Sequence, residues 1–204
     1  MAKDAYPLLI PLSIITLLSF AFDYRFLGIL ILGLACLVGY FFRDPDRKIT
    51  TDPLAIVSPA DGKIVRIDPA ADGTTRISIF LSVLNVHINR APVEGIIEKI
   101  TYSPGRFRAA FRDDASLENE KNILVIGNSR CRIQFNQIAG VLARRVVCWK
   151  HEGETVAKGE RIGLIKFGSR VDVFLPAGVD ILVTLGSAIK GGSSIIGRVN
   201  HASN

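Results

Sequence analysis

Residues 161–190, RIGLIKFGSRVDVFLPAGVDILVTLGSAIK, decide the fold of the globular part of the chain. Three short apolar runs, Arg161 to Lys166, Val171 to Leu175 and Asp180 to Leu185, are separated by segments that contain Gly, Ser and Pro. Short runs rich in β-branched residues and bounded by turn-favouring residues are typical of β-strands joined by tight turns. This stretch therefore predicts strands and no long helix.

The same pattern extends upstream to Ile56. Further strands are predicted at Lys63–Asp68, Thr75–Val83, Ile96–Tyr102, Asn122–Ile126, Arg130–Phe135 and Val141–Trp149. Many short strands at close spacing are typical of a small barrel or a sandwich. We therefore expect residues 49–204 to form a mainly β domain, as a compact barrel or sandwich.

Two glycine-containing stretches near the C-terminus resemble each other. KGERIG at residues 158–163 and KGGSSIIG at residues 190–197 both place Lys-Gly before Ile-Gly, and the second is longer. They predict related turns, of the kind found in lipoyl-like hairpins. The longer turn contains Gly192, Ser193 and Ser194. With only two copies, chance similarity is the alternative.

The N-terminal segment is apolar. Tyr6–Phe22 and Phe26–Phe42 carry no charge and are separated by Asp23-Tyr24-Arg25. This pattern predicts a membrane-associated hydrophobic helical hairpin over residues 1–48. As a helix each stretch would be roughly 25 Å long, against about 30 Å for a hydrocarbon core, so full crossing and shallow insertion both stay open. A cleaved signal peptide is the alternative, which the second apolar stretch disfavours.

Positive charge flanks the two apolar stretches. Lys3 precedes the first, Arg43, Arg47 and Lys48 follow the second, and only Arg25 lies between them. The positive-inside rule then places the globular domain on the cytoplasmic face of the cell membrane. A net charge of +6 and a pI near 9.4 suit an anionic lipid surface or a nucleic acid. The membrane segment, together with the lack of a long basic run, favours lipid and predicts no nucleic-acid partner.

One basic cluster is interleaved with aromatic residues. Arg106, Arg108 and Arg112 alternate with Phe107 and Phe111. This composition suits contact with a lipid phosphate and shallow insertion into a membrane surface. A solvated loop is the alternative.

The cysteines predict no metal site. Cys36, Cys131 and Cys148 are odd in number and lack the spacing of metal ligands. We expect three reduced thiols, which fits a cytoplasmic globular domain.

The Gly192-Ser193 bond can carry unusual chemistry. In a tight turn the serine hydroxyl can attack the preceding carbonyl and convert the amide into an ester, and a glycine leaves that carbonyl accessible. β-Elimination followed by hydrolysis then gives a pyruvoyl group and ammonia. The pyruvoyl ketone can form an imine with a substrate amine and withdraw electrons from its α-carbon. Taken alone, Gly-Gly-Ser-Ser is more often a flexible turn.

Other short motifs accompany this bond in a fixed order. They are Phe41-Phe42-Arg43-Asp44-Pro45, Ser58-Pro59-Ala60-Asp61-Gly62, Val86-His87, Arg90-Ala91-Pro92-Val93-Glu94-Gly95, Pro104-Gly105, Glu118-Asn119-Glu120-Lys121-Asn122, Phe167-Gly168-Ser169-Arg170-Val171-Asp172 and Gly192-Ser193-Ser194. With these motifs the chain resembles the phosphatidylserine decarboxylases, in particular their short, membrane-associated form. The resemblance covers nearly the whole chain.

The resemblance implies a self-processed enzyme. Cleavage between Gly192 and Ser193 would give a large β chain, residues 1–192, and a small α chain, residues 193–204, which form a heterodimer. Ser193 would become a covalent pyruvoyl cofactor that forms a Schiff base with phosphatidylserine and releases carbon dioxide and phosphatidylethanolamine. A related serine lipid with ether-linked tails would undergo the same chemistry.

The resemblance also assigns roles to single residues. Asp61 matches the family's acidic residue in self-processing, with a turn residue as the alternative. His87 matches the residue that assists processing and protonates the carbanion after carbon dioxide leaves. Ser194 is expected to donate to the developing oxyanion or to complete the turn. Asn85 replaces a common acidic residue and Arg90 a second histidine, which leaves the base for self-cleavage open: His87 serves both steps, or Asp61 and water suffice.

Residues 152–175 also resemble a lipoyl or biotinyl hairpin, and this resemblance implies a function of a different class. Lys158 would then be the modified lysine of a non-catalytic, membrane-anchored carrier or adaptor. A carrier lysine normally lies between apolar or acidic residues at an exposed tip, whereas Lys158 precedes Gly159 within a turn. We therefore expect the decarboxylase.

Overall fold

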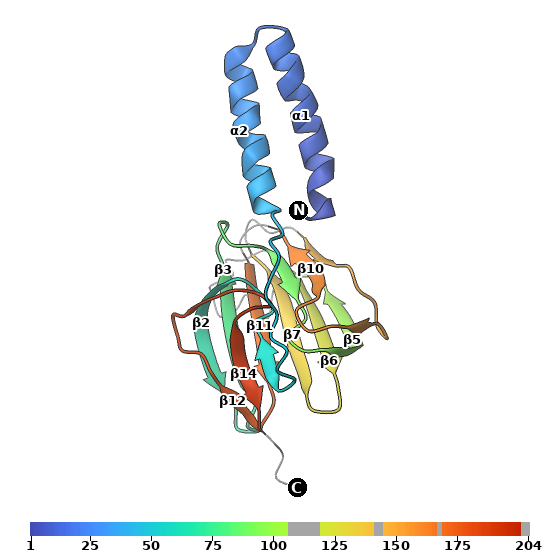
Figure 1. Ribbon diagram of the computed structural model, residues 1–204, viewed down its shortest axis with the longest axis vertical. Helices are drawn as coiled ribbons and strands as arrows, with labels where there is room; N and C mark the ends of the chain where they lie inside the picture. The colour runs from blue at the N-terminus through green and yellow to red at the C-terminus, as the bar shows by residue number, and fades with distance from the viewer. Residues whose placement is uncertain (106–118, 141–144, 167–168, 201–204) are drawn as a thin grey trace. The chain divides into compact units, whose positions relative to one another are not determined.

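Figure 1 shows the computed structural model of the chain. The structure describes residues 1–105, 119–140, 145–166 and 169–200. The chain divides into two compact units, Met1–Asp46 and Arg47–Asn204, and each is described by itself.

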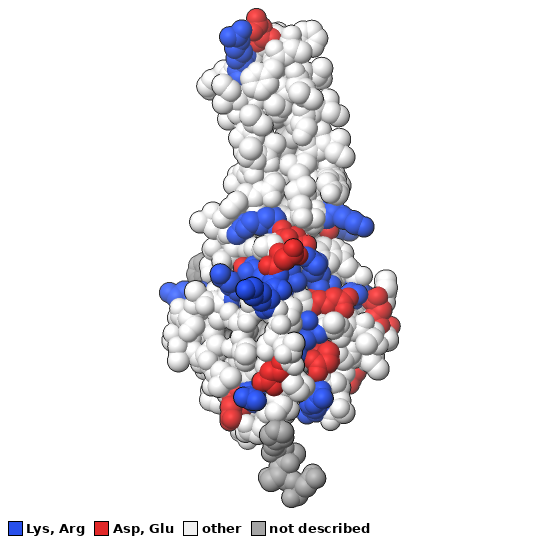
Figure 2. Space-filling model, viewed as in Figure 1, with Lys and Arg blue, Asp and Glu red and all other residues white. Residues whose placement is uncertain are grey.

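The first unit is a pair of apolar helices. A short 3-10 helix, η1 (Lys3–Ala5), leads into α1 (Tyr6–Ala21), and α2 (Arg25–Phe41) runs back along α1. In the connecting turn Asp23 has a positive φ of 64°, and its carboxylate accepts a hydrogen bond from Arg25 Nε at 2.9 Å. Figure 2 shows this charged pair at the tip of an otherwise uncharged helical surface.

The two helices differ in length. The continuous helix Lys3–Ala21 has 19 residues and is long and apolar enough to cross a membrane, whereas Arg25–Phe41 is a shorter apolar helix. Signal sequences have the same length and composition. The helix therefore indicates an association with a membrane, without distinguishing a permanent anchor from a signal sequence. The predicted hydrophobic helices at the N-terminus are confirmed.

The second unit is built on an eight-stranded antiparallel sheet (Figure 1). In spatial order its strands are β13 (Ala188–Ile189), β2 (Gly62–Pro69), β3 (Thr75–Leu81), β11 (Ser169–Leu175), β7 (Arg132–Ala139), β6 (Lys121–Gly127), β5 (Gly95–Ser103) and β9 (Thr155–Val156).

Two three-stranded sheets complete the unit. One has the order β1 (Ala55–Val57), β14 (Ile195–Val199), β12 (Val179–Ile181), and the other β4 (Ile88–Arg90), β10 (Arg161–Ile165), β8 (Val146–Cys148). Ile56, Ile162 and Ile196 from these sheets share one hydrophobic core with the large sheet. The mainly β prediction is confirmed. Of the two predicted forms, the closed barrel is wrong for the described strands, which form open sheets.

Side-chain alternation along the central strands produces this core. Ile77 and Ile79 on β3 pair with Val173 and Val171 on β11, and Phe135 on β7 pairs with Val173 from the other side. All five side chains are fully buried. Residues two apart on a strand point to the same face, so the register aligns the apolar positions of three strands on the core side of the sheet.

One end of the large sheet carries the start of β2, the end of β3 and the end of β13. β2 begins directly after Asp61, next to the last residues of β3, because Lys63 pairs with Phe80. The last residue of β13, Ile189, pairs with Gly62. We call this end of the sheet the Asp61 end.

The opposite end of the sheet, which we call the far end, carries other connections. Pro69 at the end of β2 pairs there with Thr75 at the start of β3. Ile96, near the start of β5, pairs with Gly127 at the end of β6. Antiparallel pairing thus separates the two sets of loops by the length of the strands.

Replacement of Phe135 by Ala tests the core. Because its ring is fully buried, we expect Phe135→Ala to lower the free energy of unfolding by about 3–5 kcal/mol. Thermal unfolding of the full chain in detergent measures the change. Tyr102→Ala removes a ring that is 56% exposed, so it serves as the control and should cost less than about 1 kcal/mol. Equal losses for the two variants would contradict this core.

Candidate active site

The segment between β13 and β14 is a tight turn closed by its own hydrogen bonds. The backbone amides of Ser193 and Ser194 both donate to the carbonyl oxygen of Lys190, at 3.1 and 2.9 Å. In return the Lys190 amide donates to Oγ of Ser194 at 2.9 Å. The Ser194 hydroxyl oxygen therefore completes the turn, while its proton remains available for a second acceptor.

Gly192 occupies a position in this turn that only glycine fits. Its φ is +78°, a region that residues with a Cβ rarely adopt. An added Cβ would lie 2.9 Å from Cδ of Arg90 and 3.0 Å from Cδ1 of Ile49. The amide of Gly192 also donates to the carbonyl oxygen of Ser58 at 2.7 Å. Backbone conformation, packing and hydrogen bonding thus all fix the residue before Ser193.

The loop Ser58-Pro59-Ala60-Asp61 lies alongside the turn. The Ser58 amide donates to the carbonyl oxygen of Ser194 at 2.8 Å. Oδ1 of Asp61 accepts a hydrogen bond from the amide of Gly191, also at 2.8 Å. Two motifs that lie 130 residues apart in the sequence therefore meet at one site.

Asp61 is paired with Arg47, a partner that sequence reasoning missed. Nη2 of Arg47 lies 2.9 Å from Oδ1 and 2.7 Å from Oδ2 of Asp61. Only 10% of the Arg47 side chain and 12% of the Asp61 side chain are exposed. Each carboxylate oxygen is thus engaged, and the described residues show no hydrogen bond between the side chains of Asp61 and Ser193. This arrangement suits a residue that positions the turn.

Arg90 connects the two related glycine turns. Its Nη1 donates to the carbonyl oxygen of Gly159 at 2.9 Å, while its Cδ lies next to Gly192. Gly159 has a φ of +75°, close to that of Gly192. The similarity between residues 158–163 and 190–197 therefore corresponds to two neighbouring turns with the same backbone handedness.

Known proteins are similar to this chain over the residues that form the site. The family model described as phosphatidylserine decarboxylase matches residues 34–197. A protein of Syntrophus aciditrophicus is 42% identical over 204 residues, which is 96% of both chains. One from Solibacter usitatus is 49% identical over 83% of this chain and 81% of its own, and one from Anaplasma phagocytophilum is 43% identical over 95% and 88%. All three are named phosphatidylserine decarboxylase proenzyme.

The chain belongs to the phosphatidylserine decarboxylase family. The family that the sequence motifs indicated is therefore confirmed. The family model covers the last part of α2, from Leu34 on, the Ser58–Asp61 loop and the turn at Gly192.

His87, the histidine that the decarboxylase motifs single out, is buried beside the start of β4. The residue is 2% exposed, and Nδ1 lies 2.9 Å from the carbonyl oxygen of Asn85. A carbonyl oxygen only accepts hydrogen bonds, so Nδ1 carries the proton and Nε2 is the nitrogen that gains or loses one. Oδ1 of Asn85 accepts from both the amide and the hydroxyl of Ser82. Asn85 thus orders the loop that leads to His87.

Lys158 has the wrong surroundings for a carrier lysine. Its Nζ donates to the carbonyl oxygen of Asp52 at 2.5 Å and lies 3.4 Å from a carboxylate oxygen of Glu94. Only 7% of the side chain is exposed. This contact geometry argues against the carrier alternative. Arg106, Arg108 and Arg112 lie outside the described residues.

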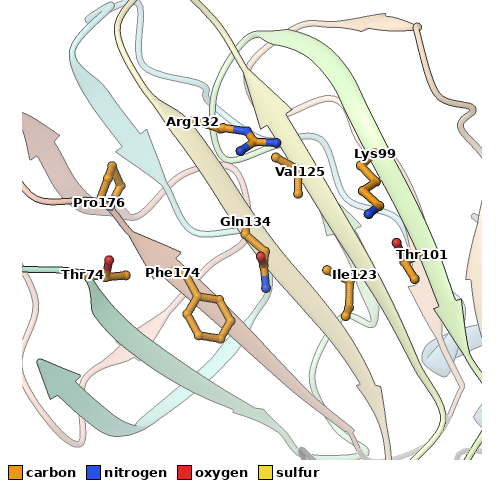
Figure 3. Close-up of a pocket in the computed structure, with 9 residues that line it drawn as sticks. All are labelled: Thr74, Lys99, Thr101, Ile123, Val125, Arg132, Gln134, Phe174 and Pro176. Atoms are coloured by element: carbon orange, nitrogen blue, oxygen red, sulfur yellow. The ribbon is translucent and has the colours of Figure 1, made fainter. Parts of the chain in front are cut away.

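A hollow of about 560 Å³ lies elsewhere, on the large sheet (Figure 3). It is lined by Thr74, Lys99, Thr101, Ile123, Val125, Arg132, Gln134, Phe174 and Pro176. Neither Asp61, His87 nor Ser193 lines this hollow. It is therefore distinct from the site at the Gly192 turn.

No group of three metal-ligating side chains occurs among the residues that the structure describes. Cys131 and Cys148 are free thiols. Burial raises the pKa of both thiols above the usual 9.0, and the charge of Glu94 adds to the shift at Cys131. Both thiols therefore stay protonated to a higher pH than an exposed cysteine.

The raised thiol pKa predicts slow alkylation. Because the thiolate is the reactive form, iodoacetamide should modify native Cys131 and Cys148 slowly near pH 8, and the rate should still increase above pH ~9. Peptide mass spectrometry over a pH series measures the rate at each cysteine. The urea-unfolded chain is the control, and identical pH profiles in the native and unfolded chains would contradict the burial of these thiols.

Proposed function

We propose that this chain is a phosphatidylserine decarboxylase that is synthesised as a proenzyme and cleaves itself between Gly192 and Ser193. Family membership across most of the chain supports the reaction, in which phosphatidylserine gives phosphatidylethanolamine and carbon dioxide. The cofactor is a covalent pyruvoyl group. The observation that supports Ser193 as its source is the turn around Gly192, with its positive φ and its hydrogen bond to Asp61.

The turn suits the formation of a pyruvoyl group at Ser193. Ser193 is only half-buried, and it follows a glycine that Arg90 and Ile49 hold in one conformation. A pyruvoyl group supplies a ketone that condenses with a primary amine and withdraws electrons from the adjacent carbon. After cleavage the small chain would start at Ser193 and remain attached through β14, which pairs with β1 and β12. This pairing supports a heterodimer of the two chains.

Self-cleavage uses only groups of the chain and one water molecule. Oγ of Ser193 attacks the carbonyl carbon of Gly192, a base takes the hydroxyl proton, and the C–N bond breaks as the amine nitrogen is protonated. Loss of the Ser193 α-proton then expels the Gly192 carboxylate and leaves dehydroalanine. Water adds to this residue and ammonia leaves, which gives the ketone. No oxidant or reductant is required.

Asp61 and Arg47 position the scissile bond. The carboxylate of Asp61 holds the amide of Gly191, and Arg47 holds the carboxylate. With both of its oxygens engaged, Asp61 is poorly placed to take the Ser193 proton. The family's acidic residue therefore acts here by orienting the turn, and Arg47 acts through Asp61.

His87 is the proton carrier in this proposal. The hydrogen bond between Nδ1 and Asn85 fixes the ring and directs proton exchange to Nε2. His87 would deliver a proton to the substrate α-carbon after carbon dioxide leaves, and would assist the attack of Ser193 during cleavage. Ser194, through its hydroxyl proton, could donate to the oxyanion that forms on Gly192.

The membrane attachment follows from the substrate and the N-terminal helices. The helical hairpin, residues 1–48 by composition, would hold the domain of residues 49–204 at the lipid surface. The positive charges of Lys3, Arg43 and Lys48 support a cytoplasmic orientation of that domain under the positive-inside rule. Arg47 contributes less to this bias, because it is paired with Asp61. Arg106, Arg108 and Arg112 remain candidates for lipid phosphate contact. Phosphatidylserine is the proposed substrate, and a related serine lipid would fit the same headgroup chemistry.

Removal of the Ser193 hydroxyl tests its proposed role as the nucleophile of self-cleavage. Wild type should convert to two chains and release carbon dioxide from phosphatidylserine vesicles, whereas Ser193→Ala should stay a single chain without activity, because no nucleophile remains. Ser194→Ala is the comparison variant, because it keeps the Ser193 nucleophile. It loses the hydrogen bond from the Lys190 amide and the proposed oxyanion donor, so it should cleave more slowly but still give two chains. Denaturing gels and trapped ¹⁴CO₂ measure both steps, and cleavage of Ser193→Ala would contradict the proposal.

The geometry of the scissile turn is tested at Gly192. Gly192→Ala introduces a Cβ into a strained φ and against two side chains, so cleavage should slow by at least about 100-fold as the turn is displaced. Gly178→Ala is the matched control, since Gly178 has a φ of +80° and nothing within 4 Å of an added Cβ. The rate at which the small chain appears should be unchanged in Gly178→Ala. Equal rates for the two variants would overturn the role of Gly192.

Arg47 is tested separately for folding and for processing. Arg47→Met leaves a buried carboxylate without its partner, which should cost about 3–5 kcal/mol of stability and slow cleavage. The double variant Arg47→Met/Asp61→Asn removes the unpaired charge, so the melting temperature should recover while cleavage stays slow. Arg47→Lys should restore part of the cleavage rate. Full recovery of cleavage in the double variant would show that the ion pair is only structural.

A further inference from the structure

The turn between β3 and β4 presents two consecutive apolar side chains to solvent. Val83 is 45% exposed and Leu84 is 63% exposed. Among the described residues of Arg47–Asn204, no other two consecutive large apolar side chains are both exposed. Single exposed apolar residues are common on protein surfaces, but an adjacent pair at a loop tip is a candidate contact surface.

This turn is held rigidly by its flanking residues. The amide of Asn85 donates to the carbonyl oxygen of Ser82 at 2.9 Å. Oδ1 of Asn85 accepts from the Ser82 amide at 2.9 Å and from the Ser82 hydroxyl at 2.8 Å. Three hydrogen bonds thus close the loop below Val83 and Leu84. A tip that is already ordered loses little conformational entropy when it binds.

The strand register places this tip at the Asp61 end of the sheet. β3 ends at Leu81, one residue beyond Phe80, which pairs with Lys63 at the start of β2. Val83 and Leu84 therefore project beyond the sheet at the same end as Asp61 and the Gly192 turn. His87 follows Leu84 by three residues along the chain. The apolar tip and the candidate active site share one end of the domain.

A phospholipid substrate requires this end to face the membrane. The serine headgroup is joined through its phosphate to a glycerol whose acyl chains stay in the bilayer, so the reacting α-carbon lies within the headgroup layer, only a few ångströms from the phosphate. Any enzyme that works on the bilayer must bring its active site to that layer. Apolar side chains that insert about 5–10 Å into the lipid hold the surface of a protein at the headgroup layer. Lys63 and Lys190, which are exposed at the same end, suit anionic headgroups.

We propose that Val83 and Leu84 insert into the lipid surface and dock the Asp61 end of the domain on the bilayer that carries the substrate. The proposal rests on the proposed function, since a lipid substrate gives the tip its partner. It adds to the N-terminal helices a second membrane contact, whose role is to orient the active site.

Two forms of phosphatidylserine, vesicles and dispersed monomers, distinguish an effect on membrane docking from an effect on the chemical reaction. The full chain carrying Val83→Ser and Leu84→Ser together should require on the order of ten-fold more phosphatidylserine in phosphatidylcholine vesicles for half-maximal carbon dioxide release, because two apolar side chains no longer enter the lipid. Short-chain phosphatidylserine, supplied as dispersed monomers, should be decarboxylated at the wild-type rate. Ile96→Ser is the matched control, since Ile96 is 51% exposed but lies at the far end. It should behave as wild type on both substrates.

Depth-dependent quenching tests insertion without any turnover. Tryptophan at position 84, introduced as Leu84→Trp, should be quenched by phosphatidylcholine brominated on its acyl chains, and Ile96→Trp should not be quenched. The single native Trp149 is common to both proteins and is subtracted. Equal quenching of the two variants, or an equal loss on vesicle and short-chain substrates, would overturn the docking role. If wild type released no carbon dioxide from either substrate, the proposed function would fail while the quenching result would still decide docking.

Discussion

The ion pair between Arg47 and Asp61 is the interaction on which the candidate site depends. Oδ1 of Asp61 is shared between Nη2 of Arg47 and the amide of Gly191, so one carboxylate joins the segment before β1 to the turn that holds the proposed scissile bond. Both side chains are nearly buried, and a buried carboxylate without a partner is strongly unfavourable. The position of the turn is therefore coupled to a charge pair as well as to the pairing of β13 and β14 with their neighbours.

Packing around Gly192 adds a second constraint. Arg90 and Ile49 fill the space that a Cβ would need, and Arg90 also holds the neighbouring turn at Gly159. The loop Ser58–Asp61 also constrains Gly192, because the Gly192 amide donates to the carbonyl oxygen of Ser58 while the residue keeps its positive φ. A strained residue that its surroundings fix is a common feature of reactive backbone sites. The Asp61 end of the large sheet thus brings together the proposed self-cleavage turn, Asp61 and the tip of Val83 and Leu84.

Sequence reasoning succeeded where the pattern is local and failed where contacts are long-range. Short runs rich in β-branched residues and bounded by turn-favouring residues predicted β2, β3, β5 and β11 closely, because these signals are local in the sequence. The run Asp180–Leu185 was predicted as one strand, but β12 ends at Ile181, since Gly186 turns away to bond with Ile64. The motif placed Asp61 at the site, yet it gave no sign of Arg47, and Arg90 was noted only as a departure from the family pattern. Their partners lie 14 and 69 residues away, and only the fold brings them together.

The central claim is that Ser193 is converted into the cofactor after the chain cleaves itself. The mass of the small chain tests this most directly, because hydrolysis and pyruvoyl formation leave different ends on residues 193–204. Our account predicts a fragment lighter by one ammonia than the peptide that starts with serine, and no free amino group at its N-terminus. A small chain with an intact N-terminal serine, or a fully active protein that remains a single chain, would contradict it.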